Sequence, residues 1–453
     1  MKIVNPATEE IIVDIQVDTE ASIAEKLIKL KKGQKQWAAL PINERLGCII
    51  KFGELVMEQK NELAEILTSE TGKPLQQSLN EIIGAQNRID HLKTNAEKWL
   101  QQEMIVEGET SEKIAYEPLG VIGNISAWNF PYNVGYNVFL YALTGGNAVL
   151  YKPSEYATLT GLKFRELLWK AGVPQDVFEC AIGEGSVGNM LLESKLDGYF
   201  FTGSYGTGKY IAEKVAGKLV PLQLELGGKD PLYVMDDVPD IKQAAVNAAE
   251  GAFYNNGQSC CAVERIYVHE NIYDTFLDEF VQEVERYTIG DPNDLGSFIG
   301  PLTRSAQIDI LLNQIADATE KGATILTGGK ELFGAGYFMQ PTVLSNVNHS
   351  MNVMMEESFG PIIGIQKVDS DEEAVNLMQD TPYGLTSAVF SSNQLRAEKV
   401  LAQLNTGTVY WNCCDRVSPN VPWSGRKNSG LGSTLSYIGI RAFVQPKSYH
   451  LRG

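Results

Sequence analysis

The sequence predicts an α/β fold built on two parallel sheets. From about residue 118, short apolar runs rich in β-branched residues alternate with stretches of helical periodicity. This alternation is typical of βαβ units, in which helices cover both faces of a parallel sheet. The alternation restarts after Gly227-Gly228, and a chain of 453 residues is too long for one ordinary core. We therefore expect a second α/β domain after the first.

The expected elements follow in order along the chain. In the first series we expect strands at 121–126, 148–151, 177–182, 199–202 and 219–226, separated by helices near 133–143, 158–171, 186–194 and 206–216. Gly172 followed by Pro174 is a helix stop signal. In the second series we expect strands at 231–235 and 265–269 and helices at 240–254 and 271–287.

The two ends of the chain flank these series. Residues 20–95 hold charged, helix-forming segments that we expect to pack on the first sheet. The tail after Leu435 ends in a β-like segment. An exposed strand at that point would favour pairing with another subunit, so we expect a homodimer or homotetramer.

Composition excludes several classes of partner. The chain has 38 Lys and Arg against 56 Asp and Glu, a net charge of −18, which disfavours nucleic acid and anionic membranes. The N-terminal stretch has no long apolar region, so we expect no signal peptide and a cytoplasmic location with reduced cysteines. The six cysteines and four histidines show no zinc-ligand spacing, so we expect no metal site.

Polar residues follow two of the expected strands directly. In "SAWNFP", Asn129 lies between aromatic residues just beyond a strand, where its amide could stabilise an oxyanion or simply form a turn. In "YKPSE", Glu155 could accept the hydroxyls of a ribose, with Lys152 beside it. The alternative is a helix start in which Ser154 is the cap. Open sheets of this class bind ligands at this edge.

In two further stretches, a glycine comes directly after an expected strand. "FTGSYGTG" places Gly203 and Ser204 before a helix, where backbone amides suit a phosphate, but it lacks the GxGxxG spacing and is weak evidence. In "LQLELGG" the leucines face a core and Glu225 points the other way. That face is exposed to solvent unless it lines a cleft between domains, in which case Glu225 is a candidate general base.

The pair Cys260-Cys261 in "NNGQSCCA" leaves two readings open. In an extended segment successive side chains point to opposite faces, so only one thiol can face a given cleft. Each cysteine could equally be a small buried apolar residue. No lysine or histidine lies nearby in the sequence, so local chemistry does not choose between them.

Together these stretches resemble the NAD(P)-dependent aldehyde dehydrogenase superfamily, and specifically its non-acylating members. The resemblance covers nearly the whole chain and rests on motifs that occur in order, namely "SAWNFP", "YKPSE", "FTGSYGTG", "LELGGK", "NNGQSCCA", "EESFGP" and "WSGRKNSGLG". It implies oxidation of an aldehyde to an acid through a cysteine thiohemiacetal and a thioester. The implied cofactor is NAD, with NADP possible.

The resemblance also implies roles for individual residues. Cys260, two positions after Gly-Gln, matches the nucleophile, Asn129 the oxyanion amide and Glu225 the general base. Glu357 matches the nicotinamide-ribose ligand. The implied cofactor contacts are Ser126, Trp128, Lys152, Ser154, Glu155, Gly203, Ser204, Glu357 and Phe359.

The implied fold is a Rossmann-like cofactor domain, a second α/β catalytic domain and a small β oligomerisation element. We expect the cofactor domain at 1–98 and 119–227 and the catalytic domain at 228–430. The oligomerisation element is expected at 99–118 and 431–453. The enzyme rival is a CoA-acylating semialdehyde dehydrogenase, which typically lacks the carboxylate that Glu225 matches. The non-enzyme rival is a binding protein on the same scaffold.

Departures from the family pattern affect the proton path and the substrate. Val138 and Thr434 stand where some members carry a lysine and a glutamate that relay protons. The common Pro-Phe-Gly-Gly is Pro-Trp-Ser-Gly here, with Trp423 in the altered position. The aldehyde is not readable from the sequence. Aromatic residues could line a channel for apolar or cationic aldehydes, or could be core: Trp128, Tyr132, Tyr136, Trp411 and Trp423.

Overall fold

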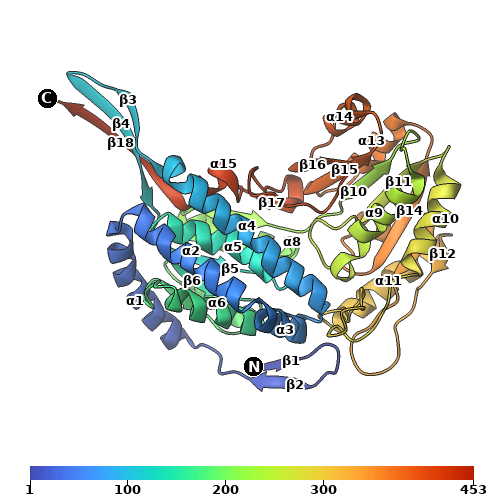
Figure 1. Cartoon of the computed structure of the whole chain (residues 1–453), viewed down its shortest axis with the longest axis horizontal. Coiled ribbons are helices and arrows are strands. Elements are labelled where there is room, and N and C mark those ends of the chain that lie inside the picture. The colour runs from blue at the N-terminus through green and yellow to red at the C-terminus, as the bar shows by residue number, and fades with distance from the viewer.

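The computed structural model describes residues 1–453 and contains two α/β bodies and a projecting arm (Figure 1). The first body is built on a six-stranded sheet and the second on a seven-stranded sheet. The two bodies lie side by side, and the arm extends from the first body (Figure 1).

The first sheet has the strand order β17-β9-β8-β5-β6-β7. Its parallel strands are β5 (Val121–Ile125), β6 (Ala148–Lys152), β7 (Phe178–Cys180), β8 (Gly198–Thr202) and β9 (Leu222–Glu225). The short β17 (Gly430–Leu431) pairs antiparallel with β9 at the edge. The predicted parallel sheet is thus confirmed.

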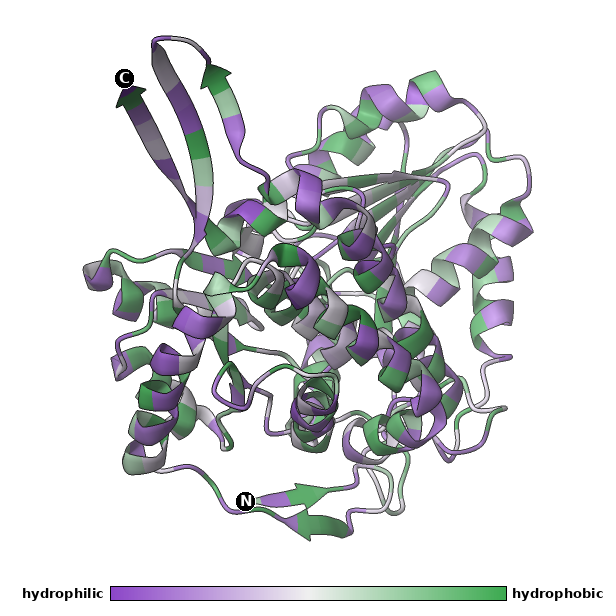
Figure 2. Ribbon diagram, turned by 60° about the vertical axis from the view of Figure 1, so that its left-hand side comes forward, coloured by the Kyte–Doolittle hydropathy of each residue, from purple (hydrophilic) through white to green (hydrophobic).

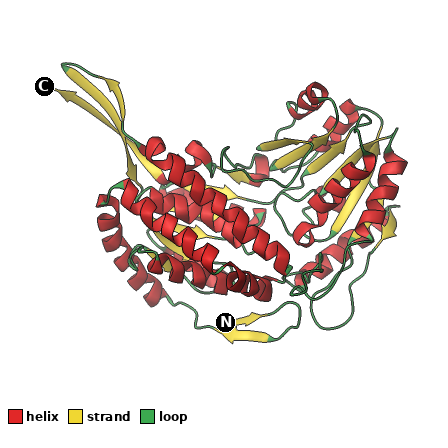
Figure 3. Ribbon diagram, in the orientation of Figure 1, coloured by secondary structure: helices red, strands yellow, loops and turns green.

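Helices link and cover this sheet. The connecting helices are α5 (Pro131–Thr144), α6 (Thr158–Lys170), α7 (Gly185–Glu193) and α8 (Tyr205–Val215). The N-terminal helices are α1 (Glu20–Ala39), α2 (Ile42–Glu58), α3 (Lys60–Thr71) and α4 (Leu75–Leu100). As predicted, these N-terminal helices pack on the first body (Figure 3). Their apolar side chains share one core with the strands.

Two of the expected strands are shorter than the sequence suggested. Residues 177–182 form only the three-residue β7, and residues 219–226 form only the four-residue β9. A 3-10 turn, η1 (Ala216–Lys218), precedes β9, and Leu219 after it is left-handed, with φ 53°, and 94% exposed. The apolar character of Leu219 is what misled the prediction, because an isolated exposed leucine does not mark a strand.

The second sheet has the order β12-β13-β14-β11-β10-β15-β16 and is parallel except for the β12–β13 pair. Its strands are β10 (Pro231–Val234), β11 (Arg265–His269), β12 (Thr324–Thr327), β13 (Thr342–Ser345), β14 (Ile362–Val368), β15 (Thr386–Phe390) and β16 (Thr408–Trp411). Successive residues of β10 point to opposite faces: Leu232 belongs to one core and Tyr233 to the other. Helices therefore cover both faces.

The helices of the second body match the prediction where one was made. They are α9 (Ile241–Phe253), α10 (Tyr273–Val284), α11 (Ala306–Glu320), α12 (Asn352–Met355), α13 (Asp371–Gln379) and α14 (Gln394–Leu401). Asp240 caps α9 by accepting a hydrogen bond from the Gln243 backbone N–H. None of the helices in the molecule combines the length and apolarity that a bilayer crossing requires.

The arm is a three-stranded antiparallel sheet of β3 (Glu103–Val106), β4 (Thr110–Pro118) and β18 (Val444–Arg452). The strand-like tail was predicted correctly, and along its whole length it pairs with β4 of its own chain. One edge of β18 remains open. Apolar residues occur along the arm, as the green bands on its strands show (Figure 2). Four of them are exposed: Met104, Ile105, Val106 and Leu451.

The remaining segments tie the bodies together. The hairpin of β1 (Lys2–Val4) and β2 (Ile11–Asp14) contacts the second body, where the Tyr337 N–H donates to the Pro6 carbonyl. After β16 the chain returns to the first body through β17, and α15 (Ser436–Ile440) leads to the arm. The short 3-10 turns are η2 (Tyr254–Gly257), η3 (Lys427–Ser429) and η4 (Arg441–Phe443).

Candidate functional site

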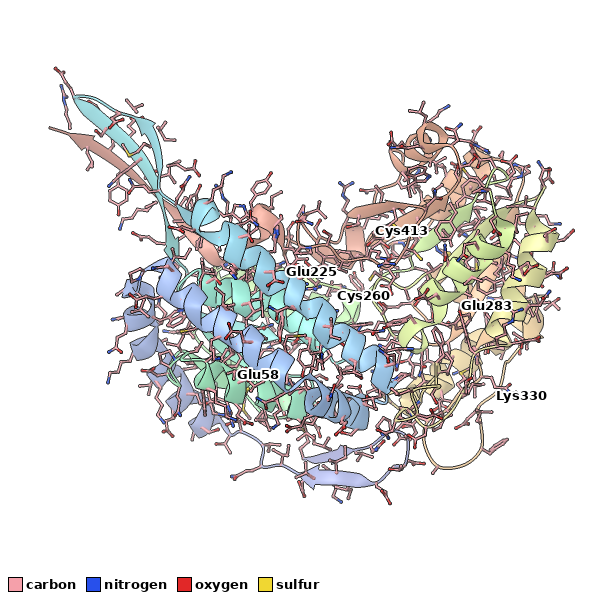
Figure 4. All side chains as sticks on the ribbon, viewed as in Figure 1. Glu58, Glu225, Cys260, Glu283, Lys330 and Cys413 are labelled. Carbon is pink, nitrogen blue, oxygen red and sulfur yellow. The ribbon has the colours of Figure 1, made fainter.

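A cavity of about 480 Å³ lies between the two bodies, and the residues that follow β5, β6, β8 and β9 line it. These positions are the carboxyl ends of parallel strands, where open α/β sheets bind ligands. Every site residue predicted from the sequence lines this cavity: Ser126, Trp128, Asn129, Lys152, Ser154, Glu155, Gly203, Ser204, Glu225, Cys260, Glu357 and Phe359. Glu225 and Cys260 lie between the bodies (Figure 4).

A tight turn after α9 presents the cysteine pair. Asn255 and Asn256 have left-handed backbones, with φ 54° and 58°, and Gly257 follows with φ 67°. A Cβ on Gly257 would lie 2.5 Å from the Gly360 carbonyl oxygen, so only glycine fits there. The turn leaves the Cys260 side chain half-buried and facing the cavity.

Cys261 points the other way and is 4% exposed. Its Sγ donates a hydrogen bond to Oδ1 of Asp415 at 2.8 Å. Contact with the Cys260 thiol, burial and the Asp415 carboxylate together raise the pKa of Cys261 well above its usual value. Of the two thiols, Cys260 therefore lines the cavity and Cys261 does not.

Asn129 is positioned by the turn that holds Cys260. Its Nδ2 donates to the Gln258 carbonyl at 3.1 Å, and Asn255 Nδ2 donates to the carbonyls of both Asn129 and Gln258. Only 4% of Asn129 is exposed. An amide carries two N–H donors, so the second can donate to a ligand atom beside Cys260.

Glu225 faces the cavity because β9 alternates its side chains. Leu224 points into the core of the first body, whereas Gln223 and Glu225 share the opposite face. Gln223 Nε2 donates to Glu225 Oε1 at 3.2 Å and Thr434 Oγ1 donates to the same oxygen at 3.5 Å. Burial raises the pKa of Glu225 to about 8. Its other oxygen, Oε2, has no hydrogen-bond partner.

Glu357 occupies the cavity close to the Gly227-Gly228 turn. The Gly228 N–H donates to Glu357 Oε1 at 3.2 Å, and burial raises the pKa of Glu357 to about 8. A Cβ on Gly227 would lie 2.1 Å from the Glu357 carboxyl, so the glycine is what lets this carboxyl reach the turn. Phe359 has a left-handed backbone, with φ 50°, and its ring lies edge-on to Trp128 at 5.6 Å.

A buried ion pair holds the Glu357–Phe359 segment, and the sequence reading missed it. Lys229 Nζ donates to Glu264 Oε2 at 2.6 Å, and neither side chain is more than 5% exposed. Glu264 also accepts from the backbone N–H groups of Ser358 at 2.9 Å and Phe359 at 3.0 Å. Lys229 and Glu264 precede the adjacent parallel strands β10 and β11, which brings these two segments close together.

Lys152 at the end of β6 and Glu155 shortly after it also line the cavity. Lys152 is 4% exposed, and burial lowers its pKa. Its Nζ lies 3.9 Å from Glu155 Oε2. Ser204 caps the eleven-residue helix α8 by accepting from the Thr207 N–H at 3.4 Å, and both residues line the cavity.

The residues of this cavity fit a nicotinamide dinucleotide. Glu155 and Glu357 supply a carboxyl for ribose hydroxyls at each end, and the N-terminus of α8 supplies backbone donors for a pyrophosphate. Gly227 has no side chain that would clash with the Glu357 carboxyl. That carboxyl accepts a hydrogen bond from the Gly228 N–H and has room to accept further donors. No group of three or more His, Cys, Asp or Glu side chains is arranged to hold a metal ion.

A second cavity, of about 340 Å³, lies on the Asp415 side of the cysteine pair. Its lining is mostly polar, namely Asn80, Asn247, Glu250, Gly251, Tyr254, Asn412, Cys413, Cys414, Asp415 and Arg416. Burial raises the pKa of Asp415 to about 6, and the nearby Glu250 carboxylate adds to that rise. Of the two alternatives left open for the aromatic residues, channel or core, the core holds for Tyr132 and Tyr136, which are at most 1% exposed.

The comparisons with known proteins agree with this geometry. The model of the aldehyde dehydrogenase family matches residues 1–449. The chain belongs to the aldehyde dehydrogenase family. It is an enzyme family of oxidoreductases, and the fold and family predicted from the sequence are confirmed.

Two relatives and two solved structures show which family members the chain is similar to. The chain is 35% identical to the peroxisomal aminoaldehyde dehydrogenase 1 of Pisum sativum over 98% of this chain and 91% of that protein. It is 34% identical to the chloroplastic betaine aldehyde dehydrogenase of Beta vulgaris, with the same coverage. The structure of betaine aldehyde dehydrogenase from Staphylococcus aureus in complex with NAD+ is 30% identical, covers 100% of this chain and 92% of that chain, and gives a TM-score of 0.96. An NADP dependent enzyme of E. coli is 30% identical, with 100% and 94% covered and a TM-score of 0.96.

Proposed function

We propose that this protein oxidises an aldehyde to the carboxylic acid with NAD(P), through a covalent intermediate on Cys260. The observation that carries the proposal is that one cavity holds a half-buried thiol, a buried amide donor and a buried carboxyl: Cys260, Asn129 and Glu225. The dinucleotide site is continuous with these groups, because Glu357 and Phe359 line the same cavity.

The first step is attack of the Cys260 thiolate on the aldehyde carbon. The carbonyl π electrons move to oxygen, and a thiohemiacetal alkoxide forms. The free N–H of the Asn129 amide and the Cys260 backbone N–H donate to that oxygen. One such donor contributes about 10²–10³ in rate. The Cys261 thiol does not compete for the aldehyde carbonyl, because it is hydrogen-bonded to Asp415 and does not line the cavity.

Bound NAD(P) would supply the hydride acceptor that turns the thiohemiacetal into a thioester. Glu357 and the Phe359 ring would hold the nicotinamide half, and Trp128 packs edge-on against that ring. Glu155 and Lys152 would hold the adenosine ribose, and the α8 N-terminus the pyrophosphate. The carboxylate of Glu155 would repel a phosphate on that ribose, so we propose NAD as the preferred form.

The last step is hydrolysis of the thioester. Glu225 in its ionised form removes a proton from a water molecule, and the water oxygen attacks the acyl carbon. The C–S bond then breaks and returns Cys260 as thiolate. A CoA-acylating enzyme has no use for this base, so the position of Glu225 favours the hydrolytic reaction.

The two cysteines provide the direct test. Cys260→Ala should abolish NADH formation, because no other thiol lines the cavity. Cys261→Ala is the matched control and should keep most activity, since its side chain contacts Asp415 outside the cavity. Loss of activity in Cys261→Ala with retention in Cys260→Ala would reject the assignment.

For the substrate, we propose a small aldehyde that carries a positive charge. Glu250 and Asp415 line the second cavity next to the cysteine pair, and Asp415 accepts a hydrogen bond from the Cys261 thiol. The named substrates of the pea and beet relatives, aminoaldehydes and betaine aldehyde, are of this chemistry. Arg416 also lines this cavity and would instead favour a carboxylate tail.

An aldehyde series separates these cases. We expect kcat/KM to be highest for 4-aminobutanal, lower for butanal and lowest for succinate semialdehyde. Glu250→Gln should reduce the preference for the amine over butanal by about tenfold, the equivalent of one charged contact of about 1.4 kcal/mol. A preference for the semialdehyde would contradict the charge argument and implicate Arg416.

We further propose that the arm joins copies of the chain into a dimer or tetramer. The open edge of β18 and the exposed apolar side chains of β3 favour pairing with another chain.

For the compartment we propose the cytoplasm, because all six cysteines are free thiols, which fits a reducing environment. The names of the pea and beet relatives place those proteins in the peroxisome and the chloroplast.

A further inference from the structure

We propose that Gln223 and Thr434 are positioning residues that hold the Glu225 carboxyl by Oε1, so that Oε2 is the atom that accepts the proton of the hydrolytic water. The inference rests on the proposed role of Glu225 as general base. Val138 and Thr434 stand where some family members carry the lysine and the glutamate of a proton relay. In this chain the neutral side chains of Gln223 and Thr434 contact Glu225 instead.

The short sequence Gln223-Leu224-Glu225 places the first of these donors. Side chains two positions apart on a strand share one face, so Gln223 lies beside Glu225. Gln223 is 3% exposed, and its Nε2 donates to Glu225 Oε1 at 3.2 Å. Because both residues belong to β9, this contact is fixed by the sheet.

The second donor comes from 209 positions further along the chain. β17 pairs with β9, with Gly430 opposite Glu225, and brings the segment after it to the same edge. Thr434 and Trp423 then exchange two backbone hydrogen bonds of 2.8 Å each, which fix the position of Thr434. The Thr434 side chain is 0% exposed, and its Oγ1 lies 3.5 Å from Glu225 Oε1.

Both donors therefore go to the same oxygen of Glu225. Oε2 is buried and has no partner, although Glu225 as a whole lines the cavity that Cys260 also lines. A buried carboxyl oxygen is costly to leave unpaired, so an unpaired one at a reaction site is reserved for a ligand or a water molecule. The balanced step is proton transfer from water to Oε2, attack of the water oxygen on the acyl carbon, and departure of the Cys260 sulfur.

No charged group contributes to this arrangement. The titratable side chains that line the cavity with Glu225 are Lys152, Glu155, Tyr156, Tyr210, Cys260, Arg304 and Glu357. None of them is hydrogen bonded to Glu225, and the causes that set its pKa are burial, which raises it, and the bonds from Gln223 and Thr434, which lower it. The two neutral donors thus favour the ionised form that acts as base.

The test is the pH profile of steady-state turnover in Gln223→Leu and Thr434→Val. Removing a donor should raise the pKa of Glu225, so the acidic limb of the profile should move to higher pH by about 0.5–1 pH unit for Gln223→Leu. Thr434→Val should shift it by less, because the 3.5 Å contact is the longer one. Thr434→Ser keeps the hydroxyl and should restore the wild-type profile.

The burst of NADH formation distinguishes positioning from general damage. In both variants we expect the burst to keep its wild-type rate, because only the hydrolytic step uses Glu225. An acidic limb that stays in place in Gln223→Leu and Thr434→Val would overturn the inference, and so would equal losses in burst and turnover. The proposed function fails by a different result, namely a Glu225→Gln variant with normal turnover. Thr434→Val is nearly isosteric, so it remains informative if Gln223→Leu does not fold.

Discussion

Replacing Glu264 by glutamine should weaken cofactor binding without touching the cofactor. Glu264 neutralises the buried Lys229 and accepts the backbone N–H groups of Ser358 and Phe359. Glutamine keeps the size of the side chain but removes its charge and one acceptor oxygen. The segment that contains Glu357 and the left-handed Phe359 then loses part of its support.

The structure sets the expected size of this effect. Breaking a buried ion pair by removing one partner costs about 3–5 kcal/mol of folding stability. A lost hydrogen bond to a charged group is worth about 1.5–3 kcal/mol, so displacement of the segment should raise the KM for NAD at least about tenfold. The KM for the aldehyde should change little, because Glu264 does not line the second cavity.

The assay is a double-mutant cycle. Urea unfolding and steady-state kinetics are measured for Glu264→Gln, Lys229→Met and the double variant. Removing both charges should recover part of the stability, because no buried charge is left unpaired, but the KM for NAD should stay high. A KM for NAD in Glu264→Gln within about twofold of wild type would show that the pair does not position the segment.

Three further outcomes are expected. Wild-type enzyme should have a higher kcat/KM with NAD than with NADP, and Glu155→Gln should narrow the ratio; a tenfold preference for NADP would contradict the role given to Glu155. Burial raises the pKa of Glu225 to about 8, so if its ionised form is the base, steady-state turnover should rise with pH through about 8 when hydrolysis limits the rate; a profile that falls across this range would contradict that role. Light scattering should show a dimer or tetramer, and Ile105→Lys on the arm should shift it to smaller species; a wild-type monomer at micromolar concentration would reject the arm as an interface.

The sequence predicted the sheets, and it picked out candidate residues that line one cavity, because both features have local signals. Apolar runs with helical segments between them predict βαβ units, and polar residues just after strands must meet at the carboxyl edge of a parallel sheet. Asn129, Lys152 and Glu225 were found in this way. The assignment of Cys260 came from the resemblance, and the orientation of the two thiols in the structure supplies the physical reason for it.

The features that the sequence reading missed depend on contacts between distant segments. Thr434 reaches Glu225 only because β17 joins the edge of the first sheet, and no periodicity in "SGLGSTL" announces that pairing. The bond from Cys261 to Asp415 likewise joins residues 154 positions apart. Tyr132 and Tyr136 come soon after Asn129 in the sequence, which left a channel role open, but helix α5 turns both rings into the core.

The most direct test of the account is rapid mixing of Glu225→Gln with NAD and an aldehyde. If Glu225 serves hydrolysis of the thioester, the variant should give a fast burst of up to one equivalent of NADH per site. Steady turnover should then fall by about 10²–10⁴-fold, the usual contribution of a general base. Hydroxylamine, which cleaves thioesters, should restore part of that turnover. A Glu225→Gln enzyme with unchanged steady-state rate would contradict the account and return the CoA-acylating reaction to consideration.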